Sequence, residues 1–90
     1  MADAATKLTV LYFAWLRERI GTSQESVALP AEITTVGALI GWLVQRGPGY
    51  ASAFAHRRAV RCAVNQEFAD PSARVGPGDE VAFFPPVTGG

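Results

Sequence analysis

The stretch Glu80-Val81-Ala82-Phe83-Phe84-Pro85-Pro86-Val87-Thr88-Gly89-Gly90 decides the fold and carries the main functional signal. Its first five residues alternate, so that Val81 and Phe83 share one face of a strand and Phe84 lies on the other. Because proline has no amide N–H to donate to a sheet, the strand is predicted to stop at the first proline. The two prolines favour extended backbone, and we expect residues 85–90 to leave the domain as a stiff tail. Glycine allows close backbone approach, so the tip is predicted to enter a narrow cleft of another protein.

Residues 87–90 could reach about 13 Å from the domain, at roughly 3.3 Å per residue. Small residues at a chain terminus are often simply frayed. The proline pair before them and the double glycine at the end favour a functional tail instead.

A second strongly apolar strand is predicted over residues 7–14, where β-branched and aromatic residues follow one another. Leu8, Val10 and Tyr12 share one face of it, and the other face is also largely apolar. A strand that is apolar on both faces belongs in the interior of a sheet. We therefore expect the first and last strands to lie side by side at the centre.

One main helix is predicted after residue 35. Thr35 is a suitable N-cap, and the apolar residues that follow at helical spacing are Val36, Leu39, Ile40 and Leu43. Gly47-Pro48 is expected to end this helix. Gly37 and Gly41 each weaken it by up to about 1 kcal/mol relative to alanine, so that burial of its apolar face must compensate.

The other elements are predicted to be short. They are a helix or turn over residues 15–20 closed by Gly21, a strand over 25–29, a loop over 49–56 with at most one helical turn at 51–55, a strand over 59–64, a turn at Asn65-Gln66, a very short strand at Phe68 and a turn at residues 76–79. This order predicts an α+β chain in which one main helix packs on a mixed sheet, the β-grasp or ubiquitin-like architecture. Residues 1–90 are expected to form a single domain, with residues 85–90 as its tail.

Composition limits the functional classes. The chain has 90 residues, 49% of them hydrophobic, which predicts one folded domain with a small core. Its formal net charge is zero, which argues against an electrostatic grip on nucleic acid. One cysteine excludes an internal disulfide and is typical of a reducing compartment. Residues 1–6 show no signal-peptide pattern and no apolar run is long enough to span a bilayer, so we expect a soluble, cytoplasmic protein without membrane contact.

The body of the domain shows no catalytic group of its own. Cys62 lies in an apolar strand and is predicted to be an inert core thiol. His56, the single histidine, has no partner at ligand spacing, so no metal site is expected. Arg57, Arg58 and Arg61 form a small basic patch, either a solvated rim or a docking site for an acidic partner. No phosphate-binding glycine loop and no catalytic triad is present.

Three phenylalanines suggest an interface. Alternation places Phe13 and Phe84 on the sheet face opposite the one that the helix is expected to cover, and Phe68 is predicted to join them. An exposed aromatic patch usually marks a binding surface. The alternative is a second small core beneath residues 50–58.

The chain resembles the small subunits of molybdopterin synthases, which belong to the ubiquitin-like sulfur carriers. Matching segments are spread along the sequence: Val10-Leu11-Tyr12-Phe13-Ala14 with Leu16-Arg17-Glu18, Thr35-Val36 with Leu39, Ala63-Val64-Asn65-Gln66, and the whole run from Gly78 to Gly90. A double glycine alone would fit any ubiquitin-like carrier, whereas the ending Phe-Phe-Pro-Pro-Val-Thr-Gly-Gly fits a much narrower group of carriers. The departures are extra residues at the N-terminus and the glycines of the main helix.

The resemblance implies a sulfur carrier. Gly90 would be adenylated by a ubiquitin-activating-type partner that uses ATP and magnesium, and then converted to a thiocarboxylate with sulfur from a donor protein. Pro86, Val87, Thr88 and Gly89 would enter the large synthase subunit, where the sulfur passes to cyclic pyranopterin monophosphate in molybdenum cofactor biosynthesis. The large subunit would supply catalysis, no cofactor would be bound to this chain, and the expected assembly is a heterotetramer.

The resemblance also implies that Phe13, Phe68 and Phe84 contact both partners in turn. Two other functions stay open. One is a sulfur carrier for thiamine or tRNA thiolation, and the other is a ubiquitin-like modifier attached to lysines.

Overall fold

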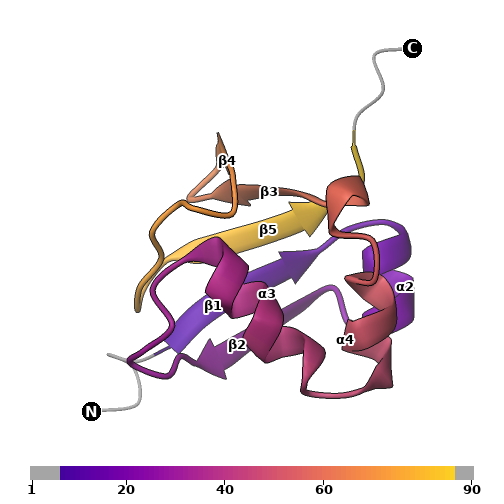
Figure 1. The fold of residues 1–90 in the computed structure, drawn as a ribbon, viewed down its shortest axis with the longest axis horizontal. Coiled ribbons are helices and arrows are strands. Elements are labelled where there is room, and N and C mark those ends of the chain that lie inside the picture. The colour runs from indigo at the N-terminus through magenta and orange to yellow at the C-terminus, as the bar shows by residue number, and fades with distance from the viewer. Residues whose placement is uncertain (1–6, 87–90) are drawn as a thin grey trace.

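The computed structural model describes residues 7–86, which form a five-stranded mixed sheet with helices packed on one face (Figure 1). The strand order across the sheet is β2-β1-β5-β3-β4. In chain order the strands are β1 Lys7–Tyr12, β2 Gln24–Ala28, β3 Arg61–Val64, β4 Glu67–Ala69 and β5 Glu80–Phe84. The helices are α2 Trp15–Ile20, α3 Val36–Val44, α4 Pro48–Ala53 and the 3₁₀-helix η1 Arg57–Ala59. The predicted β-grasp fold is confirmed.

The two most apolar strands, β1 and β5, pair in parallel at the centre of the sheet, as predicted. Val10 is in register with Val81, and Tyr12 with Phe83. All four of these side chains are at most 1% exposed, so they form the floor of the core beneath α3 (Figure 1). Parallel strands need a crossover connection, and here everything between residues 13 and 79 serves as that connection.

Helix α3 begins where the sequence predicts. The Thr35 hydroxyl accepts the amide N–H of Ala38 at 3.2 Å, which satisfies one of the free donors of the first turn. Two further amides of that turn are satisfied from outside the helix: Val36 donates to the Ala73 carbonyl at 3.0 Å and Gly37 to the Pro71 carbonyl at 2.9 Å. The predicted apolar face is buried on the sheet, and it consists of Val36, Leu39, Ile40 and Leu43.

The loop predicted over residues 49–56 is wrong, because residues 48–53 form helix α4. Gly47-Pro48 does follow α3, but Pro48 also occupies the first turn of α4, where the missing N–H is not needed. Close packing on α2 holds this helix in place. A Cβ atom on Gly49 would lie 2.5 Å from the Arg19 carbonyl oxygen, so only glycine allows this approach.

Strand limits also differ slightly from the prediction. β1 stops at Tyr12 rather than residue 14, because Ala14 turns the chain into α2 with a φ of 56°. β2 covers residues 24–28 rather than 25–29. β3 starts at Arg61 rather than residue 59, because residues 57–59 form η1. The helix over 15–20 with its Gly21 cap, the turn at Asn65-Gln66 and the limits of β5 are as predicted.

A partly buried hydrogen-bonded cluster ties β1, β2 and α4 together. The hydroxyls of Tyr12 and Tyr50 both donate to Glu25 Oε2 at 2.7 Å. Arg46 completes the cluster with an ion pair to Glu25 Oε1 at 3.5 Å. Burial first, and then the hydrogen bond to Glu25, raise the pKa of Tyr12 far above its ordinary value of 10.0.

Replacing Tyr12 with Phe is expected to lower the free energy of unfolding by about 1–2 kcal/mol near pH 7, because a buried hydrogen bond to a carboxylate is lost. The pH dependence should also change. The pKa of Tyr12 is raised in the folded state, so its stabilising contribution is complete below about pH 10 and is lost as the pH rises above that value. Urea unfolding at about pH 7 and about pH 11 checks this. The wild type should lose more stability between the two pH values than Tyr12→Phe, and equal losses would contradict the assignment.

Candidate functional site

The sheet face opposite the helices carries an aromatic surface, defined here as Phe13, Phe68 and Phe84. Phe68 is 85% exposed and Phe13 is 47% exposed, the two large hydrophobic side chains of residues 7–86 that are freely accessible. Phe84 is half-buried, and its ring lies 5.9 Å from that of Phe68. An exposed pair of aromatic rings on a small domain is typical of a binding surface.

Strand register explains why Phe68 and Phe84 meet. β3 pairs with β4 and β5 at once, so that Ala63 faces Phe68 on one side and Ala82 on the other. Alanines on this face leave room beside the larger rings. A hollow of about 290 Å³ lies between the two phenylalanines, with Arg61 and Ala69 also on its wall.

Phe13 directly follows the last residue of β1, at the end of the sheet where β5 also stops. Its amide N–H donates to the Phe83 carbonyl at 3.1 Å, which holds Phe13 beside the last residues of β5. The next residue, Ala14, has a φ of 56° and a ψ of −131°. Residues with a Cβ rarely adopt positive φ, and such strain is often found at functional positions. No pattern in the sequence predicts this turn, which sets where Phe13 leaves the sheet.

The alternative prediction, in which these phenylalanines form a second small core beneath residues 50–58, is wrong. Phe54, within the segment 50–58, is buried on the other face of the sheet and packs edge-on against Phe83 at 5.0 Å. The aromatic surface is therefore uncovered in the described part of the chain.

The tail begins directly at this surface. β5 ends at Phe84, Pro85 is half-buried and Pro86 is exposed. The predicted reacting residue Gly90 and the predicted insertion residues Val87, Thr88 and Gly89 lie outside the described residues. Their roles stay predictions.

The predicted inert cysteine is buried. The Cys62 thiol donates to the Ala69 carbonyl at 3.3 Å, and burial followed by the nearby Asp70 charge raises its pKa. Both effects keep the thiol protonated and unreactive at neutral pH. His56 is exposed, and residues 7–86 contain no group of three or more side chains placed to hold a metal ion.

The arrangement can thus present a tail and bind a partner, whereas residues 7–86 bring no acid, base and nucleophile together. A family model described as the ThiS family matches residues 10–90. The chain belongs to the ThiS family. This family match, together with the curated relatives described next, confirms the resemblance to small subunits of molybdopterin synthase.

Among relatives of this ThiS-family chain is the molybdopterin synthase sulfur carrier subunit of Haemophilus influenzae. It is 40% identical over 83 residues, which cover 92% of this chain and 99% of that protein. A solved structure from Pyrococcus furiosus, titled putative molybdopterin converting factor subunit 1, is 30% identical with a TM-score of 0.73 and covers 91% of this chain and 99% of its own.

A structure from Helicobacter pylori shares the fold of this ThiS-family chain at 21% identity, with a TM-score of 0.61, over 93% of this chain and 99% of its own. Its title describes a complex of subunits 1 and 2 of molybdopterin-converting factor. Within the described part of this chain, no helix has the length and apolar character required to cross a membrane.

Proposed function

We propose that this chain is the sulfur carrier subunit of a molybdopterin synthase and that sulfur is carried on the Gly90 carboxylate as a thiocarboxylate. The observation that supports it most is the position of the aromatic surface at the root of the Gly-Gly tail. Phe68 and Phe84 lie together on β4 and β5, and the chain leaves β5 directly into Pro85 and Pro86. A partner bound to this surface would have the tail next to it.

The chemistry requires activation, because a carboxylate is a poor electrophile. A Gly90 carboxylate oxygen would attack the α-phosphorus of ATP on the adenylating partner, and pyrophosphate would leave. A sulfur nucleophile at the oxidation level of hydrosulfide, delivered by a donor protein, would then attack the acyl carbon and expel AMP. The product is a thiocarboxylate, in which one oxygen of Gly90 has been replaced by sulfur.

In the second stage the thiocarboxylate sulfur would attack a carbon of cyclic pyranopterin monophosphate that carries an oxygen substituent. The new carbon–sulfur bond would replace the carbon–oxygen bond, and the oxygen would leave with the bonding electron pair. Water would then attack the Gly90 acyl carbon and break its bond to sulfur, which leaves sulfur on the pterin and restores the carboxylate. Residues 7–86 place no acid or base for these steps, so we assign them to a large subunit. The named relatives and the H. pylori pair support such a partner, and a heterotetramer of two small and two large subunits is the assembly that we propose.

The test is the intact mass of the chain after incubation with an adenylating enzyme, ATP, magnesium and a sulfur source. A gain equal to one oxygen replaced by one sulfur, located in the C-terminal peptide, is expected. The same reaction without ATP is the control. No gain with several cognate activating enzymes would overturn the proposal. Lysine-linked conjugates in place of the thiocarboxylate would show a modifier, and transfer of the sulfur only to thiazole or tRNA acceptors would show another carrier.

A further inference from the structure

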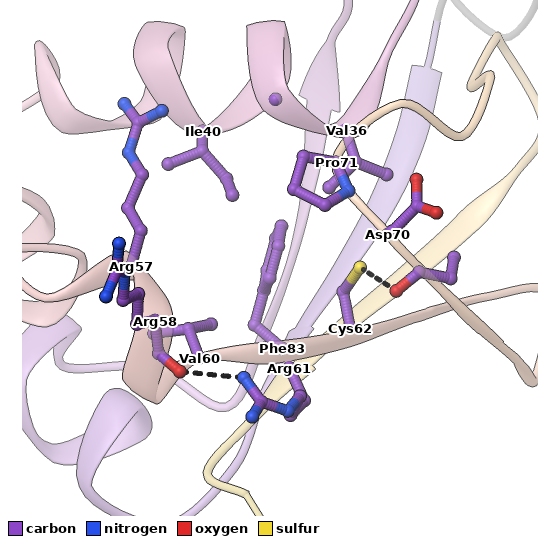
Figure 2. Close-up of a pocket in the computed structure, with 12 residues that line it drawn as sticks. Val36, Ile40, Arg57, Arg58, Val60, Arg61, Cys62, Asp70, Pro71 and Phe83 are labelled. Carbon is purple, nitrogen blue, oxygen red and sulfur yellow. Dashed lines mark hydrogen bonds between the residues drawn. The ribbon is translucent and has the colours of Figure 1, made fainter.

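A pocket of about 420 Å³ lies on the helix face of the sheet, and Arg61, Cys62 and Ala69 separate it from the hollow between Phe68 and Phe84. Helix α3 forms its roof, β3 with η1 forms one wall, and the segment after β4 closes the far end (Figure 2). Its interior is apolar, with Val36, Ile40, Val60 and Phe83 among the lining residues. Pockets of about 300–1,000 Å³ with apolar walls and a few polar groups are the usual sites for small ligands.

Two glycines on α3 lie beside the groups that bound this pocket. Gly37 lines it, and a Cβ there would lie 3.3 Å from the Pro71 carbonyl oxygen that closes the far end. One turn later, a Cβ on Gly41 would lie 4.0 Å from a terminal nitrogen of Arg57, so that the guanidinium lies over the bare backbone of α3. Each glycine costs the helix up to about 1 kcal/mol relative to alanine. The glycines weaken α3 and at the same time leave space along the roof.

Three arginines bring positive charge to the near end. Arg57, Arg58 and Arg61 all line the pocket and are all exposed. Arg61 is in register with Phe84, and its side chain donates to the Arg58 carbonyl at 2.7 Å on the side of β3 away from α3, so the guanidinium groups at the pocket itself are those of Arg57 and Arg58 (Figure 2). Within residues 7–86 none of the three has a carboxylate within 4 Å, since the ion pair found there is that of Arg46 and Glu25. Guanidinium groups bind carboxylates and phosphates through paired hydrogen bonds.

The far end has the opposite charge. Asp70 lies there beside Cys62, and Figure 2 shows it across the pocket from Arg57 and Arg58. Its carboxylate accepts hydrogen bonds from the Ser72 amide and hydroxyl, which lower its pKa and keep it charged. An anionic group is therefore attracted to the arginine end and repelled from the Asp70 end.

We propose that this pocket binds a small amphipathic anion, with a carboxylate or phosphate head on Arg57 and Arg58 and an apolar body along Ile40, Val60 and Phe83. The polarity of the pocket sets the direction in which such a ligand enters. The proposal does not depend on the proposed sulfur-carrier function, because the pocket uses no residue of the tail and none of the three phenylalanines of the aromatic surface.

The proposal is tested by titrating the isotope-labelled full chain with octanoate, octyl phosphate and 1-octanol while backbone amide shifts are followed. Octanoate or octyl phosphate should give saturable shifts at Ile40, Val60 and Cys62, and the tighter of the two identifies the preferred head. 1-Octanol, with the same apolar body and no charge, should bind at least about tenfold more weakly, because the charge-assisted hydrogen bonds are missing.

The matched variants are the double variant Arg57→Gln with Arg58→Gln, and Arg17→Gln as a control on the exposed face of α2. The double variant should weaken anion binding by at least about tenfold and keep the folded spectrum, because both side chains are exposed. The control should bind like the wild type. Absence of saturable shifts, equal binding of 1-octanol, or unchanged affinity in the double variant would each overturn the proposal. The titration involves no partner and no ATP, so its failure would not bear on sulfur transfer.

Discussion

Addition of one alanine after Gly90 is expected to abolish sulfur transfer and to leave the free energy of unfolding unchanged. The extra residue moves the reacting carboxylate by about 3.8 Å, the distance between successive Cα atoms. Misplacement of a reacting group by even about 1 Å can cost about a hundredfold in rate, so we expect a loss of more than that factor. The domain should not respond, because the change lies beyond the sheet and the core.

The measurement has two parts: thiocarboxylate formation by intact mass, and product formation with the large subunit. The control is the same alanine added before Met1, at the other end of the chain. Full activity of the extended chain, with the extension still present in the recovered protein, would contradict the assignment of Gly90. Loss of activity in both chains would point to a general effect of lengthening the protein.

Substitution of Phe68 or Phe84 by arginine is expected to be the second large effect. A charge placed in the centre of an interface loses its water without gaining a partner. Aromatic residues at such positions carry about 2 kcal/mol or more of the binding free energy, so the affinity for the large subunit should fall at least about thirtyfold. Because Phe68 is 85% exposed in the free chain, Phe68→Arg should change stability by no more than about 0.5 kcal/mol.

Phe84→Arg is the harsher variant, since Phe84 is half-buried and packs on Phe68. Calorimetric titration with the large subunit gives the affinity, and urea unfolding gives the stability. Ala38→Arg is a suitable control, because Ala38 is exposed on α3 on the other face of the sheet. If a folded Phe68→Arg chain bound the large subunit as tightly as Ala38→Arg does, the aromatic surface would not be the interface.

The sequence was sufficient for the parts of the fold that depend on local pattern. Alternation in β1 and β5 predicted their central position, because each is apolar on both faces. The Thr35 cap and the helical spacing after it predicted α3. The same alternation placed Phe13 and Phe84 away from the helices, and the exposed fraction of Phe13 agrees with that placement.

Helix α4 could not be predicted, because its sequence signals are ambiguous. Gly-Pro marks the end of one helix and equally the start of another, and Pro-Gly-Tyr-Ala-Ser-Ala is too short to show an apolar period. Tertiary contacts determine that this segment is helical: Gly49 fits against the Arg19 carbonyl, and the Tyr50 hydroxyl donates to Glu25. Partners so far apart in sequence leave no local pattern.

The site was predictable only in its residue types. The sequence singled out the arginines and the glycines of α3 as separate features, and the fold brings Gly37 and the arginines to the walls of one pocket. The 3₁₀-helix η1, which takes the place of the predicted first residues of β3, carries two of these arginines. The positive φ of Ala14 could not be predicted from the sequence, because residues with a Cβ rarely adopt positive φ and alanine is not a typical turn residue.

The central position of β5 also bears on how the protein is made. A ribosome synthesises β1 early, yet β1 pairs on one side with β5, the last strand of the described chain, and β3 pairs with that strand as well. Until β5 has left the exit tunnel, the sheet has a gap at its centre, and α3 has only part of a surface to pack on. Contacts of this sequence separation form slowly, so we expect the sheet to form only after β5 has left the tunnel. A chain released before β5 would expose apolar strands and be open to proteases, so quality control would act on the same segment of the chain that leads into the tail.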